Sequence, residues 1–195
     1  MRLKIVQTGE AVLRTQARPL TRDEITSDEI KRLIADMRET MLDAPGVGLA
    51  APQVGLPLQL AVIEDREDYL KSIPPAELLE KERSPVPFHV IINPQLEILD
   101  DETVQFFEGC LSLSGFSALV PRARKVRVTY WNETAEEKSV AATGWYARIL
   151  QHEIDHLHGA LYIDKMRSRT FTSIENANRF WKNKTIPEIV DALKS

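Results

Sequence analysis

The segment HEIDH at residues 152–156 constrains the fold of this chain more than any other feature of its sequence. Residues four apart lie on one face of an α-helix, so both imidazoles of such a segment can reach a single ion. Glu153 is offset by about 100° around the helix and borders the site, where a general base would act. We therefore expect a fold built around a metal-binding helix.

Residues 144–159 are predicted to form that helix, and the glycine at position 159 ends it. Its apolar side carries Ile149, Leu150, Ile154 and Leu157. The motif continues like the metzincin signature, but Tyr162 stands where that signature has its third histidine. His158 is predicted to be an exposed helix residue rather than a ligand.

A third metal ligand must therefore come from another part of the chain. Glu175 could serve, as in thermolysin-like enzymes, although nothing around it distinguishes it. Cys110 is the other candidate, because a soft thiolate beside two imidazoles suits Zn²⁺ or Fe²⁺. It lies in the segment EGCLS at residues 108–112, where a glycine lets the backbone approach closely. The residue chemistry alone leaves both candidates open.

The remaining pattern mixes helices and strands and predicts an α+β fold. Ser27 is a plausible cap for a helix that stops before a proline and a glycine. Between two predicted strands, the charged and proline-rich residues 64–87 are expected to form a surface loop. The other predicted elements are helices over residues 28–42 and 187–194, and strands over residues 58–63, 88–92 and 125–131.

Length and composition exclude several classes of protein. A chain of 195 residues fits a single domain, 1–195. With 25 basic and 29 acidic residues its net charge is −4, which argues against nucleic acid or a membrane surface as partner. The lone cysteine cannot form an internal disulfide, and no apolar stretch is long enough to span a membrane. We expect a cytoplasmic location in a bacterium, or an organelle matrix for a processed eukaryotic form.

Three segments together resemble the motifs of the peptide deformylase family. Residues 46–53 (GVGLAAPQ) match G-x-G-x-A-A-x-Q, residues 108–112 match E-G-C-x-S, and residues 152–156 match H-E-x-D-H. All three match without substitution and in the family's order, and the similarity runs from about Val12 to Met166. The surroundings at residues 144–148 and 168–172 look more like the organellar branch than the common bacterial one.

The resemblance implies antiparallel sheets packed around a central metal-binding helix. It implies that Cys110, His152 and His156 hold one divalent metal ion, with water in the fourth position. Iron(II) is the ion expected in the cell, and zinc, nickel or cobalt can replace it. Glu153 would accept a proton from water and deliver it to the departing amine.

The same resemblance implies roles around the metal. The side-chain amide of Gln53 and the backbone N–H of Leu111 would stabilise the oxyanion. Gly48 would pair its backbone with the peptide, and the methionine pocket would be walled by Val47, Trp145 and Ile149. A supporting charge network would join Glu108, Arg122 and Asp155.

The implied reaction is removal of the N-formyl group, as formate, from the formylmethionine that begins a new polypeptide. The expected partners are nascent formylated peptides, the ribosome as a transient contact, and hydroxamate inhibitors such as actinonin. Two alternatives stay open. A metallopeptidase would take its third ligand from downstream, and a binding module would close a structural site with a fourth protein ligand.

Overall fold

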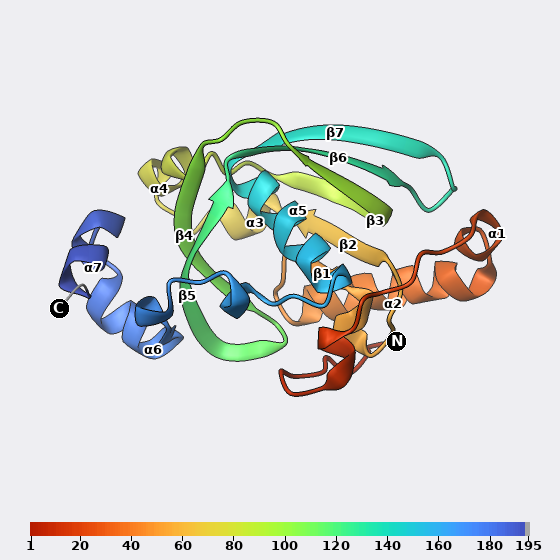
Figure 1. The fold of residues 1–195 in the computed structure, drawn as a ribbon, viewed down its shortest axis with the longest axis horizontal. Coiled ribbons are helices and arrows are strands. Elements are labelled where there is room, and N and C mark those ends of the chain that lie inside the picture. The colour runs from red at the N-terminus through yellow and green to blue at the C-terminus, as the bar shows by residue number, and fades with distance from the viewer. Residues whose placement is uncertain (194–195) are drawn as a thin grey trace.

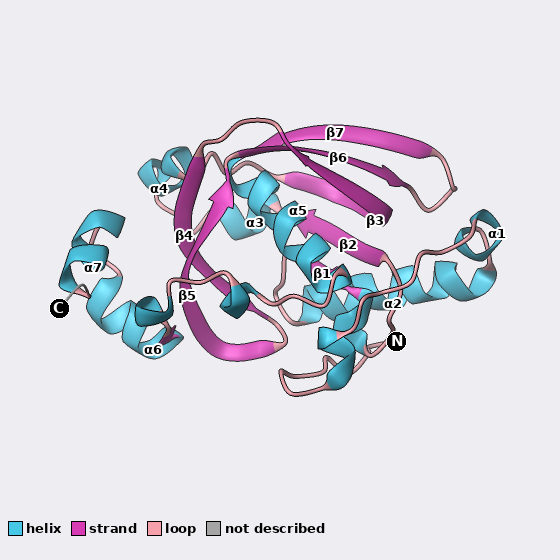
Figure 2. Cartoon of the chain, in the orientation of Figure 1, coloured by secondary structure: helices cyan, strands magenta, loops and turns pink. Residues whose placement is uncertain are grey.

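The computed structural model describes residues 1–193 and contains two antiparallel sheets (Figure 1). The larger sheet has the strand order β1-β2-β3-β6-β7, and the smaller one the order β4-β5-β8 (Figure 2). The strands are β1 Gly48–Ala50, β2 Leu60–Asp65, β3 Val86–Ile98, β4 Thr103–Cys110, β5 Leu113–Ala123, β6 Lys125–Trp131, β7 Glu137–Thr143 and β8 Thr172–Ser173.

Helix α5, Gly144–Leu157, contacts strands of both sheets. Its apolar side packs on one face of the larger sheet, where alternate strand residues supply the core, among them Ala61, Ile63, Ile91, Val126 and Val128. The predicted helix over residues 144–159 is thus confirmed, with Gly159 beyond its end at a φ of +73°. The predicted α+β class, with antiparallel sheets around a central helix, is also confirmed.

Helix α2, Asp28–Asp43, covers the opposite face of the larger sheet. Its buried residues Ile30, Ile34, Met37 and Met41 pack on the strand residues that point away from α5, such as Leu60, Val62 and Ile92. The Oγ of Ser27 accepts a hydrogen bond from the Ile30 N–H, as its predicted role as a cap requires. Strands β1 and β2 and the first half of β3 are therefore covered on both faces, whereas β7 is largely exposed.

The three strand predictions were right for one strand, shifted for the second and too short for the third. Strand β6 has the predicted bounds, and β2 lies two residues later than predicted. Strand β3 runs well beyond residues 88–92 and includes Pro87 and Pro94. Both prolines lie near places where the pairing register shifts, at Asp65 opposite Val86 and between Ile92 and Gln95. A proline nitrogen carries no hydrogen to donate, so a proline is tolerated where the pairing between strands is interrupted.

The prediction of a plain surface loop over residues 64–87 was wrong. This segment completes β2 and contains two short helices, α3 Glu67–Leu70 and α4 Pro75–Glu80. Leu70 is buried, and the side chain of Asp65 is 0% exposed where it pairs with Arg83. Most of its residues are exposed, as the charged composition had suggested, but the Asp65–Arg83 ion pair and the side chain of Leu70 attach the segment to the rest of the protein.

The remaining helices are short. They are α1 Arg22–Ile25, α6 Ile174–Asn176 and α7 Ile186–Ala192, with 3-10 turns at Ala11–Arg14, Ala51–Val54, Tyr162–Asp164 and Ser168–Thr170, and a π-helical turn at Ala177–Trp181. Helix α7 corresponds to the prediction over residues 187–194, whose last residue lies outside the described residues. Among the helices described, none combines the length and apolar character that crossing a bilayer requires.

Candidate metal centre

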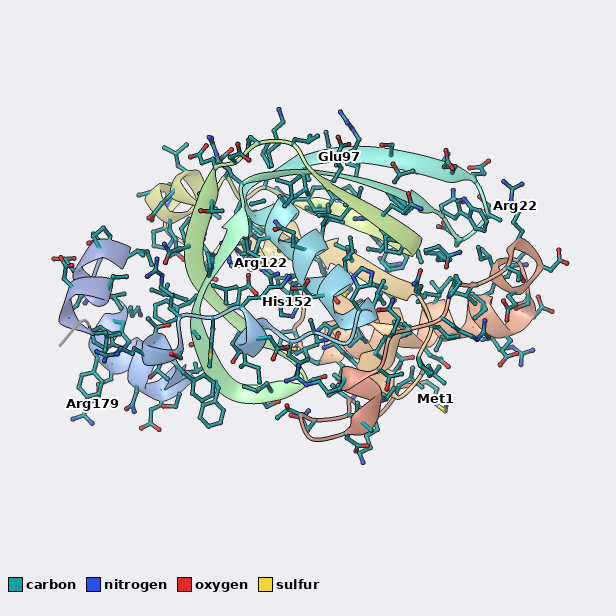
Figure 3. All side chains as sticks on the ribbon, viewed as in Figure 1. Met1, Arg22, Glu97, Arg122, His152 and Arg179 are labelled. Atoms are coloured by element: carbon teal, nitrogen blue, oxygen red, sulfur yellow. The ribbon has the colours of Figure 1, made fainter. Side chains whose placement is uncertain are left out.

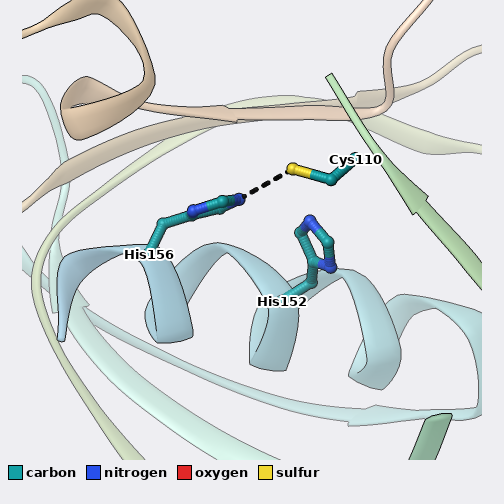
Figure 4. A group of neighbouring side chains, drawn as sticks. All are labelled: Cys110, His152 and His156. Atoms are coloured by element: carbon teal, nitrogen blue, oxygen red, sulfur yellow. Dashed lines mark hydrogen bonds between the residues drawn. The ribbon is translucent and has the colours of Figure 1, made fainter. Parts of the chain in front are cut away.

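Cys110, His152 and His156 meet at one point in the interior (Figure 4). One ligand atom from each lies within 4.8 Å of the others, and the Cys110 Sγ is 3.3 Å from the His156 Nε2. Sulfur and nitrogen ligands of a tetrahedral zinc ion lie about 3.6 Å apart, given bonds of about 2.3 and 2.1 Å. The three side chains therefore have the spacing of a metal site.

The two histidines come from successive turns of α5, as predicted from their spacing of four residues. Cys110 comes from the end of β4, which forms a hairpin with β5. The pairing register shifts between Glu108 and Cys110, and Cys110 then pairs with Leu113 across the turn. This irregularity at the hairpin end places the cysteine against the helix.

The environment of His152 favours a cation at this point. Its Nδ1 lies 3.0 Å from the Glu108 Oε2, which leaves Nε2 for a metal. Burial would lower the pKa of His152, but its hydrogen bonds with Cys110 and Glu108 outweigh burial and raise that pKa well above its usual value. A metal ion between the thiolate and the imidazole would replace that proton.

His156 is buried, and burial holds its pKa well below its usual value. Its imidazole is therefore neutral, which is the form that binds metal. Its Nδ1 has no hydrogen-bond partner among the described residues. The ring lies edge-on to that of His152, with centroids 5.0 Å apart. The donor set thus consists of a thiol and two imidazoles, which fits Zn²⁺ or Fe²⁺.

A buried charge network supports the ligands, and it contains the three residues expected. Arg122 donates two hydrogen bonds to Glu108, both of 2.9 Å, and one to Asp155. Figure 3 shows Arg122 and His152 in the interior, close to α5. Glu108 thereby links the arginine on β5 to the metal-ligand face of α5.

Two members of this network were missed from the sequence. Arg148, on α5, donates to Glu108 over 2.6 Å and to the backbone carbonyl of Val120 over 2.9 Å. Lys165 donates to Asp155 over 2.6 Å. Their signal was weak, because an arginine and a lysine have no required spacing to their acidic partners.

Glu153 lies beside the metal ligands but belongs to no ion pair found among the described residues. It is 4% exposed, and burial raises its pKa to about 7. Its Oε2 is buried and has no hydrogen-bond partner in the described part of the chain. A carboxyl group with such a pKa can take up and release a proton near neutral pH.

Gln53 faces the cysteine from the segment that follows β1. It is 1% exposed, and its Nε2 lies 3.5 Å from the Cys110 Sγ and 3.3 Å from the Ser112 Oγ. Its Oε1 accepts a hydrogen bond of 2.8 Å from the Ala50 N–H, which fixes the amide with its NH₂ group toward Cys110. Leu111 follows the cysteine in the turn between β4 and β5.

The N-terminal segment ties these two loops together, which sequence reasoning missed. The N–H of Val6 donates to the Gln53 carbonyl over 2.9 Å, and the N–H of Thr8 donates to the Ser112 carbonyl over 2.7 Å. Gln7 also donates from its side chain to the Leu111 carbonyl over 3.0 Å. An extended segment with no motif of its own thus holds both sides of the site.

A pocket of about 390 Å³ opens from the candidate metal centre. Its lining includes Val47, Trp145 and Ile149, the expected walls of the methionine pocket, and Gly48, which is expected to pair with the peptide. Gln53, Cys110, Leu111, His152 and Glu153 line the same pocket. Sequence reasoning missed Arg83, Phe107, Phe116, Arg148 and Ile174 in the same lining. His156, the third member of the ligand group, is not part of the pocket lining.

The other ligand candidates lie elsewhere. Glu175 is exposed and is not in the ligand group found among the described residues. His158 is exposed at the end of α5, as predicted. Tyr162 is buried, and its ring stacks at 6.4 Å from that of His152.

Comparison with known proteins gives consistent matches. A family model described as polypeptide deformylase matches residues 2–172. Peptide deformylase 1A, chloroplastic, of Solanum lycopersicum is 46% identical over 172 residues, which are 88% of this chain and 62% of that protein. The chain therefore spans less than two thirds of the length of this relative.

Two solved structures share the fold. The Met-ala-ser bound class I type b peptide deformylase from Acinetobacter baumannii gives a TM-score of 0.74 at 32% identity, covering 85% of this chain and 99% of that one. A peptide deformylase from Synechococcus elongatus in complex with actinonin gives a TM-score of 0.70 at 35% identity, covering 93% of this chain and 85% of that one.

Proposed function

Because this chain belongs to the polypeptide deformylase family, we propose that it removes the N-formyl group, as formate, from the initiator formylmethionine of new polypeptides. The observation that carries this proposal is the position of Glu153. A buried carboxyl group with a pKa of about 7 lines the same pocket as Cys110 and His152. A hydrolase needs such a group to move the proton of water, whereas a structural metal site does not.

Cys110, His152 and His156 would hold one divalent ion through one sulfur and two nitrogen atoms. Once bound, such an ion lowers the pKa of water and polarises a carbonyl oxygen. Glu108 fixes the tautomer of His152, and Arg122 holds Glu108 in turn. The protein thereby keeps the ligand atoms in place before and after each turnover.

Glu153 acts as the proton carrier. Its carboxylate takes the proton of the attacking water and gives it to the amine nitrogen as the C–N bond of the formamide breaks. The Oε2 of Glu153 has no hydrogen-bond partner within residues 1–193, which leaves one oxygen available for this transfer. Formate and the free N-terminal amine are the products.

Negative charge that develops on the formyl oxygen would be met by two donors. One is the Gln53 Nε2, whose direction is set by the bond from Ala50 to the Oε1. The other is the backbone N–H of Leu111, next to Cys110. Donors held in place before the reaction stabilise the transition state without a reorganisation cost.

The substrate would lie along the pocket with its formyl group at the metal ligands. Gly48 would pair its backbone with the peptide, while the methionine side chain would be covered by Val47, Trp145 and Ile149. Trp145 lies two helical turns before His152, about 10 Å along the axis of α5. A long unbranched side chain suits that distance.

The proposal extends to the metal, the partners and the location. Iron(II) is the expected ion in the cell, with zinc, nickel or cobalt as substitutes, because a thiolate and two imidazoles accept each of them. Actinonin would bind at the same pocket, and nascent chains would be presented near the ribosome. Residues 1–195 would act as one catalytic domain, in a bacterial cytoplasm or an organelle matrix.

The two alternatives fit less well. A metallopeptidase with a downstream ligand would leave Cys110 away from the histidines, and it is beside them. A structural site would need a fourth ligand, and the group formed by the described residues has three. Glu153 would have no task in such a site.

The test is an assay of formate release from formyl-Met-Ala-Ser with protein purified without oxygen, together with metal analysis of the same sample. We expect about one divalent ion per chain and turnover that disappears when a chelator removes it. Formate release that is absent from the metal-loaded protein would overturn the proposal.

A further inference from the structure

The segment at residues 81–83 packs on the first turn of α5, although 61 or more residues of sequence separate the two. The backbone N–H of Trp145 donates to the Lys81 carbonyl over 2.9 Å. Gly144 has a φ of +57°, and a Cβ there would lie 2.4 Å from the Glu82 Cβ. Only glycine permits this close approach. The end of the 64–87 segment is thus fitted to the start of the helix.

Three cationic groups surround the ring of Trp145. The Lys81 Nζ lies 4.9 Å from its centroid, and the Cζ atoms of Arg83 and Arg148 lie 5.2 and 5.9 Å away. All three are within the range of cation–π attraction. The ring is therefore held by side chains from two separate parts of the chain.

The 64–87 segment contributes two of these cations, Lys81 and Arg83, and Arg83 is the more firmly held. Its guanidinium donates two hydrogen bonds to Asp65, of 2.8 and 2.9 Å. Asp65 is fully buried and the Arg83 side chain is 12% exposed. Such a paired, planar contact fixes the guanidinium more tightly than a single bond from a lysine would.

Arg83 and Trp145 both line the pocket that starts at the metal ligands. We propose that Arg83, held by Asp65, is a positioning residue that fixes Trp145 as the end wall of the methionine pocket and so sets its depth. The inference rests on the proposed deformylase function. It gives the 64–87 segment a task in substrate selection.

The geometry predicts that loss of Arg83 affects substrates with a long first side chain more than substrates with a short one. A methionine side chain is long enough to approach a wall two helical turns from the metal ligands, whereas an alanine side chain ends far short of it. Displacing the wall therefore weakens binding of formylmethionine and has a smaller effect on formylalanine. A role in stability alone would change both substrates equally.

The experiment compares formyl-Met-Ala-Ser with formyl-Ala-Ala-Ser in Arg83→Met. Since this change leaves Asp65 buried without its partner, the double variant Asp65→Asn/Arg83→Met removes both charges and guards against a folding defect. We expect KM for the methionine peptide to rise by about 3- to 10-fold, with a smaller change in kcat and in the alanine peptide. Arg83→Lys should restore part of the loss.

Lys71→Met is the matched control. Lys71 belongs to the same segment and pairs with Asp68 over 2.7 Å, but it is exposed and does not line the pocket. The Lys71→Met variant should therefore leave the ratio of kcat/KM for the two peptides unchanged. Calorimetry of Met-Ala-Ser binding gives a second readout, and the affinity should be lower in Arg83→Met and in the double variant.

The inference would be overturned if the ratio of kcat/KM for the two peptides were unchanged in Arg83→Met and in the double variant. An equal loss on both peptides would overturn it as well. Wild-type protein that releases no formate from either peptide would instead refute the proposed function. The two failures are therefore distinguishable.

Discussion

The carboxylate of Glu153 fills the space that a side chain on Gly48 would occupy. A Cβ at position 48 would lie 2.2 Å from the Glu153 Oε1 and 2.5 Å from its Cδ. The glycine in β1 and the glutamate on α5 are thus in direct contact. The glycine of the first motif is required by the glutamate of the third.

This contact predicts a severe effect for Gly48→Ala. The added methyl group must push the carboxylate out of its place, so we expect kcat for formyl-Met-Ala-Ser to fall by about 10²-fold or more. Gly46→Ala is the control, because a Cβ there meets the flexible end of Leu111, at 2.8 Å. Normal turnover in Gly48→Ala would contradict this assignment of space.

Glu153→Ala should separate metal binding from turnover. The three ligands remain, so the metal content should stay at the wild-type value, while loss of the proton carrier should lower kcat by about 10²-fold or more. Metal analysis and formate release on one sample measure both. Near-normal formate release would remove Glu153 from the mechanism.

Glu108→Gln tests the buried charge network. Burial would raise the pKa of Glu108, but hydrogen bonds from Arg122 and His152 outweigh it and hold that pKa well below its usual value of 4.5. The folded state therefore favours the carboxylate, which contributes stability above about pH 4.5 and loses it as the pH falls further. The amide cannot balance the two arginines, and we expect a loss of about 3 kcal/mol at pH 7.

Urea unfolding of metal-free wild type and Glu108→Gln between pH 7 and pH 3 checks both points. The free energy of unfolding of the wild type should fall more steeply with acid than that of the variant. Parallel curves would show that Glu108 is not the group that titrates.

Substrate preference should follow the shape of the site. The formyl carbon lies among Gly48, Gln53 and Leu111 in the proposed complex, so formyl-Met-Ala-Ser should react and acetyl-Met-Ala-Ser should be refused. Formyl-Met-Ala-Ser should also exceed formyl-Asp-Ala-Ser by about 10- to 100-fold in kcat/KM, because the pocket rewards an apolar side chain. Equal rates on the formyl and acetyl peptides would contradict the proposed reaction.

Metal removal should destabilise the protein through its ligands. An ion that binds the folded chain raises Tm, so a chelator should lower Tm by several degrees. Cys110→Ser replaces a soft ligand with a hydroxyl group and should make Tm insensitive to the chelator. Thermal unfolding with and without added Zn²⁺ measures this, and a chelator-sensitive Cys110→Ser would place the ion elsewhere.

The elements with a clear period were predictable. Helix α2 buries one face and β6 alternates, so a simple pattern identified them. Helix α5 was identified from the spacing of its apolar residues and its histidines, although nearly all of its residues are buried. Strands β4 and β5 were missed, because charged residues such as Glu108 and Arg122 are buried in them and break the apolar pattern. Partners far apart in sequence decide the burial of such residues.

The residues of the candidate site also divide into those that the sequence predicted and those that it did not. The ligands lie where the motifs indicated, since chemistry and spacing restrict a thiol and two imidazoles strongly. Arg83, Phe116 and Ile174 carry no such signature and reach the pocket through the tertiary fold. The resemblance to a family supplied roles, while only the structure showed what touches Trp145.

The hydrogen bonds from Val6 and Thr8 to the loops at Gln53 and Ser112 have a consequence during synthesis of the chain. Val6 and Thr8 are synthesised well before the acceptor at Ser112, and His156, the last residue of the candidate ligand group, follows later still. A growing chain that has not reached residue 156 therefore lacks part of the candidate metal centre. If the proposed function holds, the protein cannot act on other unfinished polypeptides until its own synthesis has passed that residue.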